Sequence, residues 1–209
     1  MKILITGFDP FGSYLINPSI EAVKLLPTKL LNVDIITLEV PTVLNQSIEL
    51  VQQAIHHHQP DCVLSVGLAQ GRQGLTIERV AININDFRIA DNQNNQPIDT
   101  KVVEDGPDAY LLSVPIKAMM VKCLENNIPA SISNTAGTFV CNHLAYGVAH
   151  LAKTQYPQML TGFVHIPSVS ESNDQAMSLQ EVVRGLTCCL IAIIENQQHD
   201  FQISGGKED

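Results

Sequence analysis

Basic residues are scarce in this chain: 12 lysines and arginines stand against 21 aspartates and glutamates, a formal net charge of −9 at pH 7. No cluster of Lys or Arg is present, so we expect no nucleic-acid partner, because such a partner normally requires a basic patch. Long apolar runs are also absent, which argues against a membrane-spanning helix. Residues 1–6 are too short, and run too soon into Gly7 and Asp9, to form a signal peptide. We therefore expect a soluble, cytoplasmic protein.

The cysteines show no pattern of a disulfide framework or a zinc site. They form an odd set without CxxC spacing, and three of them fall within apolar patterns, which is typical of a reducing compartment. The five are Cys62, Cys123, Cys141, Cys188 and Cys189. The adjacent Cys188 and Cys189 lie within a helical pattern, and the sequence assigns them no role. A run of histidines at 56–58 indicates a solvated helix end before Pro60, with metal binding as the weaker interpretation.

What is present is an ordinary globular composition, 45% hydrophobic and 16% charged over 209 residues, in which strand and helix signals alternate. Strands are predicted at 2–6, 33–40, 62–66, 75–85, 130–133 and 160–166. Helices are predicted at 18–26 behind an Asn17 cap, 44–58, from Pro115 through Cys123, 141–156, and from a Ser178/Glu181 capping box to about 196. Because the apolar strands have no polar face, we expect a three-layer α/β/α sandwich around a mostly parallel, twisted sheet.

No linker or internal repeat divides the chain, so we expect one α/β domain over residues 1–209. Residues 91–108 are dense in Asn, Asp, Gln and Pro and have almost no apolar pattern. We interpret them as a surface excursion, either an insertion or an oligomer contact. The tail from 199 to 209 is expected to be frayed.

Cys141 is predicted to lie at the first turn of the helix that follows the strand at 130–133. Unpaired N–H groups and the positive end of the helix dipole favour a thiolate at such a place. The same N–H groups are suited to hold an oxyanion formed by attack on a carbonyl. A buried structural cysteine is the alternative interpretation.

A cysteine nucleophile needs a base, and the base needs an orienting group. His143 is too close to Cys141 along the chain and His150 lies further along the same helix, whereas His165 ends a neighbouring strand at the same edge of the sheet. Glu78 shares an apolar face with Val80, Ile82 and Ile84 by period-two counting, so its carboxylate needs a partner. We therefore predict a Cys141–His165–Glu78 triad. Taken singly, each residue also has a structural interpretation, as a core cysteine, a strand-end histidine and a solvated carboxylate.

Four ordered motifs accompany these residues. They are Gly7-Phe8-Asp9-Pro10-Phe11-Gly12 with Asn17-Pro18-Ser19, Glu78-Arg79-Val80-Ala81-Ile82-Asn83, Thr135-Ala136-Gly137-Thr138-Phe139-Val140-Cys141-Asn142, and Phe163-Val164-His165-Ile166-Pro167. Together they resemble the pyroglutamyl peptidase I family, also called pyrrolidone-carboxylate peptidase, a group of cytoplasmic cysteine peptidases. The resemblance implies an exopeptidase that removes N-terminal pyroglutamyl residues, needs no cofactor and is commonly a homotetramer. It places Cys141 as nucleophile, His165 as base and Glu78 as orienting acid.

The substrate pocket follows from the chemistry of the pyroglutamyl group, a flat, uncharged lactam. A pocket lined by Phe8 and Phe11 would accept the ring and reject an ordinary N-terminus, since burying an unpaired ammonium is costly. Asn17 is predicted both as a helix cap and as a site residue. Arg88 resembles an arginine near the site of bacterial relatives. Those relatives often carry Gln where this chain has Leu68, so either Gln70, two residues later, or backbone groups would read the lactam.

Two other functions remain open from the sequence. A nucleoside phosphorylase-like α/β enzyme could use the Gly-rich loops to bind phosphate, although no GxxxxGK[ST] pattern is present and Arg72 is the only cation of the loop at 67–74. A binding protein that keeps the fold without catalysis is the second alternative.

Overall fold

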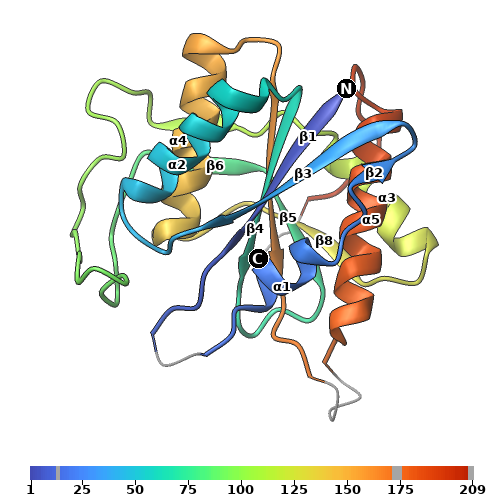
Figure 1. The fold of residues 1–209 in the computed structure, drawn as a ribbon, viewed down its shortest axis with the longest axis horizontal. Helices are drawn as coiled ribbons and strands as arrows, with labels where there is room; N and C mark the ends of the chain where they lie inside the picture. Colours follow the sequence, from blue (N-terminus) through green and yellow to red (C-terminus); the bar gives the residue numbers. More distant parts are fainter. Residues whose placement is uncertain (13–14, 171–175, 207–209) are drawn as a thin grey trace.

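A seven-stranded sheet runs through the middle of the molecule (Figure 1). The computed structural model describes residues 1–12, 15–170 and 176–206, and within these residues the strand order is β2-β3-β1-β4-β9-β5-β8. The strands are β1 (Lys2–Phe8), β2 (Lys29–Leu30), β3 (Val33–Val40), β4 (Cys62–Leu68), β5 (Leu75–Glu78), β8 (Ala130–Ser133) and β9 (Leu160–Ile166). A second sheet pairs β6 (Val80–Ile82) with β7 (Ala109–Leu111).

The four strands β3, β1, β4 and β9 run parallel, so their carboxyl ends meet at one edge. Two strands on the far side run the other way: β5 pairs antiparallel with β9, and β8 pairs parallel with β5. The short β2 is also antiparallel to its neighbour. The mostly parallel sheet predicted from the apolar strands is confirmed, with a reversal of direction between β9 and β5.

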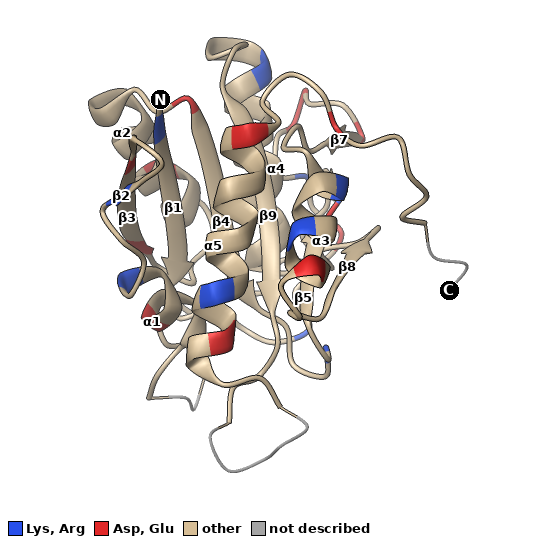
Figure 2. Cartoon of the chain, turned by 90° about the vertical axis from the view of Figure 1, so that its right-hand side faces the viewer, with Lys and Arg blue, Asp and Glu red and all other residues tan. Residues whose placement is uncertain are grey.

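Helices cover both faces of the sheet and complete the three layers (Figures 1 and 2). They are α1 (Pro18–Lys24), α2 (Gln46–His58), α3 (Ile116–Glu125), α4 (Val140–Gln155) and α5 (Leu179–Glu195). Alternate strand residues feed two separate cores: Ile3 and Ile5 pack with α1, α3 and α5, whereas Leu4 and Phe163 pack with α2 and α4. The sheet is therefore buried on both faces, as the absence of polar alternation indicated.

The helix caps lie where the sequence places them. The Asn17 side chain accepts a hydrogen bond from the Ser19 N–H, and Pro18 occupies the first turn of α1. Ser178 and Glu181 form the reciprocal capping box of α5. These side chains satisfy N–H groups that the first helical turn leaves unpaired, which is why they mark helix starts so clearly. At its other end α1 stops at Lys24, two residues before the predicted end.

The single strand predicted over 75–85 is wrong, because the chain changes sheets at Arg79. The Arg79 N–H still donates to the carbonyl of Ser133 in β8, but the Arg79 carbonyl accepts from the Leu112 N–H beside β7. Since β8 ends at Ser133, β5 loses its partner there and the following residues pair with β7 instead. Glu78 therefore does not share a continuous strand face with the later residues: Val80 and Ile82 are half-buried and Ile84 is 38% exposed.

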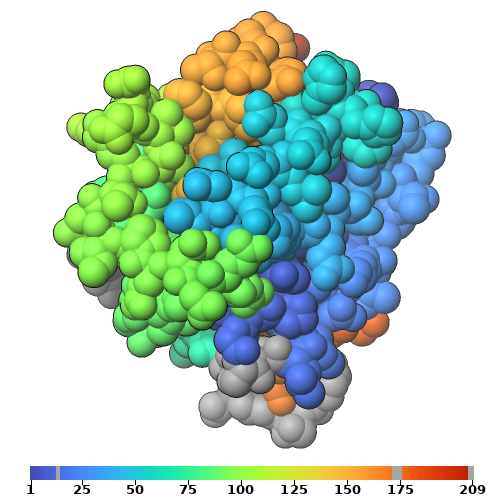
Figure 3. Space-filling view, turned by 60° about the vertical axis from the view of Figure 1, so that its left-hand side comes forward, coloured from blue at the N-terminus to red at the C-terminus, as the bar shows by residue number. Residues whose placement is uncertain are grey.

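The polar excursion at 91–108 lies on the surface beside α2 (Figure 3) and is tied down by buried polar groups. The Asp91 carboxylate accepts hydrogen bonds from the N–H groups of Leu44, Gln93 and Asn95. Burial alone would raise the pKa of Asp91, but these hydrogen bonds lower it below its usual value. The segment is thus anchored to the loop that precedes α2.

The tail, predicted to be frayed from residue 199, makes specific contacts as far as Gly205. The Asp200 carboxylate accepts hydrogen bonds from the N–H groups of Lys117 and Ala118, at the start of α3. Pro115, the residue before α3, provides no side-chain cap, so Asp200 takes that role from a distance. Arg79 donates to the Gly205 carbonyl, while residues 207–209 lie outside the described part of the chain. None of the helices described is long and apolar enough to cross a membrane.

Candidate active site

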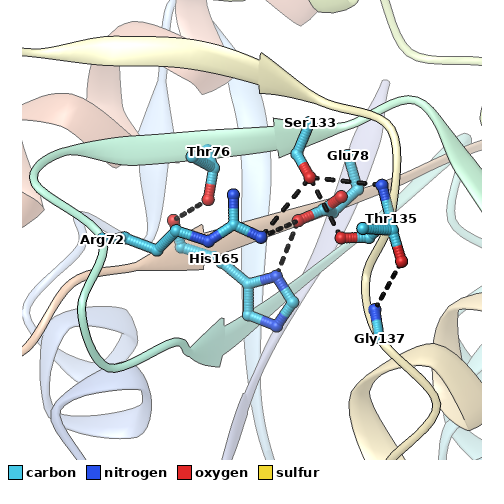
Figure 4. Close-up of polar contacts among 7 residues, drawn as sticks. All are labelled: Arg72, Thr76, Glu78, Ser133, Thr135, Gly137 and His165. Atoms are coloured by element: carbon cyan, nitrogen blue, oxygen red, sulfur yellow. Dashed lines mark hydrogen bonds and ion pairs between the residues drawn. The ribbon is translucent and has the colours of Figure 1, made fainter. Parts of the chain in front are cut away.

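Glu78 and His165 meet on the face of the sheet that α4 covers. The His165 Nδ1–H donates to Glu78 Oε1 at 2.8 Å, and the two side chains are 5% and 0% exposed. Their contact follows from strand register: Thr76 lies opposite His165 in the antiparallel β5–β9 pair, and Glu78 is two residues further on the same face. The structure thus supplies the partner that the buried carboxylate requires (Figure 4).

The environment of His165 favours its charged form. Burial by itself lowers the pKa of the imidazole, but hydrogen bonds to Cys141 and Glu78, together with their charges, raise that pKa to about 9. Nδ1 is bound to Glu78, so an interaction with Cys141 is left to the other ring nitrogen. The acid–base group of a cysteine nucleophile uses its two ring nitrogens in this way, one for the orienting carboxylate and one for the sulfur.

Cys141 is the second residue of α4, and its sulfur lies over a glycine of the sheet. A Cβ atom placed on Gly67 would come within 2.9 Å of Cys141 Sγ and within 2.9 Å of the Phe163 ring. Gly67 is paired with His165 in the β4–β9 register, so the missing side chain leaves room for the sulfur beside the imidazole. The strand predicted at 62–66 left Gly67 in the following loop, whereas β4 runs on to Leu68 and includes it. A glycine within an apolar strand is a signal of close approach.

The two histidines of α4, His143 and His150, are hydrogen-bonded to groups other than Cys141. His143 is fully buried, with Nδ1 donating to Asn85 Oδ1 at 2.8 Å and Nε2 accepting from the Asn45 N–H at 2.9 Å. Burial lowers the pKa of His143 to about 4 against the opposing charge of Asp91, so the ring is neutral. His150 bonds to the hydroxyl of Tyr110. Neither ring is available to Cys141, as the sequence predicted.

A small cavity of about 40 Å³ adjoins Cys141. Its lining consists of Phe8, Phe11, Asn17, Thr42, Leu68, Phe139 and Cys141. The structure thus brings together three of the four residues predicted for the pocket. Asn17 also holds the loop itself, because its Nδ2 donates to the Asp9 carbonyl at 2.9 Å.

Two lining residues were not predicted. Thr42 directly follows the end of β3, and Phe139 is the last residue before α4; a search of every strand end and helix start would have found both. The Phe139 ring lies 6.1 Å from that of Phe11, centroid to centroid, which closes one wall of the cavity.

Arg88 and Gln70 do not line this cavity. The Arg88 side chain is exposed, and among the described residues its backbone carbonyl accepts a hydrogen bond from Gln96. Gln70 lies along an adjoining groove of about 440 Å³ that shares Leu68 with the cavity. Within the described residues no group of three or more His, Cys, Asp or Glu side chains is placed to hold a metal ion.

A family model described as pyroglutamyl peptidase matches residues 1–196. The chain belongs to the pyroglutamyl peptidase family. It is 52% identical to a pyrrolidone-carboxylate peptidase of Finegoldia magna over 99% of both chains. Its fold superposes on the crystal structure of pyroglutamyl peptidase I from Bacillus amyloliquefaciens with a TM-score of 0.91 at 40% identity, covering 96% of this chain and 99% of the other.

A more distant member, the pyrrolidone carboxyl peptidase of Thermococcus litoralis, matches with a TM-score of 0.91 at 30% identity, over 97% of this chain and 99% of that one. These matches confirm the resemblance carried by the four sequence motifs. They support a cysteine peptidase of the pyroglutamyl peptidase family, and neither the nucleoside phosphorylase nor the silent binding protein.

Proposed function

We propose that this chain removes N-terminal pyroglutamyl residues from peptides, with Cys141 as nucleophile, His165 as acid–base group and Glu78 as its orienting carboxylate. The observation that carries the assignment is the 2.8 Å hydrogen bond between His165 and Glu78, together with the Cys141 sulfur lying over Gly67, the strand residue paired with His165. Nucleophile, base and orienting group in that order are what covalent catalysis by a thiol requires.

Acylation begins when the Cys141 thiolate attacks the pyroglutamyl carbonyl carbon, forming a C–S bond and an oxyanion. N–H groups at the start of α4 are suited to stabilise that oxyanion, since helix-start N–H groups lack partners within the helix. The His165 imidazolium then gives its proton to the departing amine as the C–N bond breaks. A thioester and a free peptide amine result.

Deacylation reverses these roles. His165, now neutral, takes a proton from water as the water oxygen attacks the thioester carbonyl. Collapse of the second oxyanion breaks the C–S bond and releases pyroglutamic acid, and the thiolate–imidazolium pair is restored. Glu78 holds the imidazole in one orientation and tautomer through both halves of the cycle.

The cavity beside Cys141 suits a flat, uncharged ring. Its walls are mainly aromatic and aliphatic, and Thr42 and Asn17 are its two polar side chains. The cavity is open to solvent, and the rings of Phe11 and Phe139, both half-buried, form one of its walls.

Location and assembly belong to the same proposal. Reduced cysteines suit the cytoplasm, and all five are free here. A homotetramer, as the resemblance implies, would cover apolar side chains that are exposed in the single chain, among them Ile98 at 73% and Leu111 at 70%.

Hydrolysis of three aminocoumarin substrates tests the function. We expect the pyroglutamyl substrate to be cleaved and the prolyl and glutamyl substrates to be left intact, because their charged N-termini would lose hydration in the cavity without gaining a partner. Iodoacetamide and the Cys141→Ala substitution should each abolish the reaction. Lack of cleavage by the intact enzyme would refute the function, while activity in Cys141→Ala would refute only the nucleophile.

A further inference from the structure

Arg72 reaches toward the buried carboxylate of Glu78 from the loop that joins β4 to β5. Its Nη2 lies 3.9 Å from Glu78 Oε1 and 3.5 Å from the Ser133 hydroxyl (Figure 4). The Arg72 side chain is 31% exposed, so the guanidinium lies between solvent and the interior. No role for this residue follows from the triad itself.

Glu78 has few groups to stabilise its charge. The side chain is fully buried, Oε2 has no hydrogen-bond partner among the described residues, and Oε1 receives only the His165 Nδ1–H. A buried carboxylate with so few donors is costly in its ionised form unless cations are near. Within the described residues, two cationic groups lie within 4.0 Å of it, and these are His165 and Arg72.

Ser133 links Arg72 to the segment that carries the nucleophile. Its hydroxyl is near Arg72, donates to the Thr135 carbonyl at 3.0 Å and is approached by the Thr135 N–H at 3.3 Å. Thr135 lies in the segment between β8 and α4, which leads to Cys141. The guanidinium thus lies near Glu78 on β5 and near Ser133, the last residue of β8, whose hydroxyl bonds to that segment.

We propose that Arg72 is a positioning residue, whose guanidinium stabilises the buried Glu78 carboxylate and holds it directed at His165. The proposal rests on the function proposed above. The charged and titratable groups around the His165 ring are Glu78 from β5 and Cys141 from α4, with Arg72 behind Glu78. Arg72 acts on catalysis through the carboxylate and does not touch the reacting atoms.

This arrangement predicts opposite effects of the two charges on the pH profile. Glu78 favours the imidazolium, so Glu78→Gln should move the alkaline limb of kcat/KM to lower pH. The Arg72 cation disfavours the imidazolium, so Arg72→Met should move the same limb upward, by about half a pH unit given partial solvent screening. Arg72→Met should also lower kcat by about tenfold with little change in KM, because small misplacements of a catalytic group are costly.

The experiment measures kcat and KM for the pyroglutamyl-aminocoumarin substrate from pH 5.5 to 10.5 in five variants. They are Arg72→Met, Arg72→Lys, Glu78→Gln, the double variant of Arg72→Met with Glu78→Gln, and Arg184→Met. Arg184 is exposed on α5 and bonds to the Asn126 carbonyl, so its substitution removes the same charge far from the site. Arg72→Lys should restore most activity, and Arg184→Met should match the unmodified protein.

The double variant separates positioning from a general effect on the loop. If Arg72 acts through Glu78, adding Arg72→Met to Glu78→Gln should cost less than about twofold. An equal loss in both backgrounds, or a pH profile of Arg72→Met that superposes on that of the unmodified enzyme, would overturn the proposal. Absence of hydrolysis in the unmodified enzyme would instead refute the function on which the proposal rests.

Discussion

The close approach of Cys141 to Gly67 makes Gly67→Ala a sharp test of the site. The new methyl group would lie 2.9 Å from Cys141 Sγ and 2.9 Å from the Phe163 ring, whereas ordinary contacts of a Cβ begin at 3.4 Å. Each of these two contacts therefore has to lengthen by about 0.5 Å. The Phe163 ring is itself packed against the His165 ring, at a centroid distance of 4.8 Å. The methyl group pushes on the sulfur directly and on the imidazole through the Phe163 ring, so the alignment of sulfur and imidazole is lost.

The expected losses of stability and of activity follow from the size of these displacements. Overpacking of this kind costs about 1–3 kcal/mol of stability, and displacement of a reacting atom by a fraction of an ångström to 1 Å lowers the rate by about 10- to 100-fold. We expect kcat/KM on the pyroglutamyl substrate to fall by that factor and iodoacetamide to label Cys141 more slowly. Urea unfolding should show that most of the protein remains folded.

Gly162→Ala is the matched control. Gly162 lies in β9, the neighbour of the strand that holds Gly67, and a Cβ there would meet Val114 at 2.6 Å on the opposite face of the sheet. It should therefore lose a similar amount of stability while kcat/KM stays near that of the unmodified enzyme. If Gly67→Ala kept full activity and full labelling of Cys141, the sulfur would not lie over Gly67 in the active enzyme.

Three further predictions concern ionisation and the tail. The alkaline limb of kcat/KM should lie near pH 9, where the raised pKa of His165 releases its proton, and should move down in Glu78→Gln; a limb unchanged by that substitution would mean that the carboxylate does not set it. The pKa of His143 is about 4 in the folded protein and about 6.5 in the unfolded chain, so below pH 6.5 the unfolded state binds a proton that the folded state does not. About 3 kcal/mol of stability is therefore lost as the pH falls from 6.5 through 4. In His143→Gln, the free energies of unfolding measured in urea at pH 7 and at pH 4.5 should differ by less than in the unmodified protein. Asp200→Ala should lower the free energy of unfolding by about 1 kcal/mol through loss of the α3 cap, and Asp200→Asn should recover part of it, whereas no change would mean that the tail does not cap α3.

The helix starts and the buried strands were determined by the sequence alone. Asn17 and Ser178 cap helices through bonds to residues two or three positions away, so their signal is local and readable. The apolar strands likewise report burial on both faces, which required the layered α/β fold. Placing Cys141 at a helix start and His165 at a strand end needed only these local patterns and the rule that carboxyl ends of parallel strands share an edge.

The contact between Glu78 and His165 depends on how distant segments pack. Glu78 was predicted on one long strand with Val80 and Ile82; its need for a partner was predicted correctly, although the strand is not continuous. The two side chains meet because β5 pairs antiparallel with β9, a segment about 90 residues away along the chain. Local sequence patterns do not show whether two such distant strands pair, or in which direction. The contact of the Cys141 sulfur with Gly67 and the bonds of Asp200 to α3 likewise join residues that are far apart in the sequence. Periodicity records which face of a segment is buried, but which segment lies against that face is settled when the layers pack.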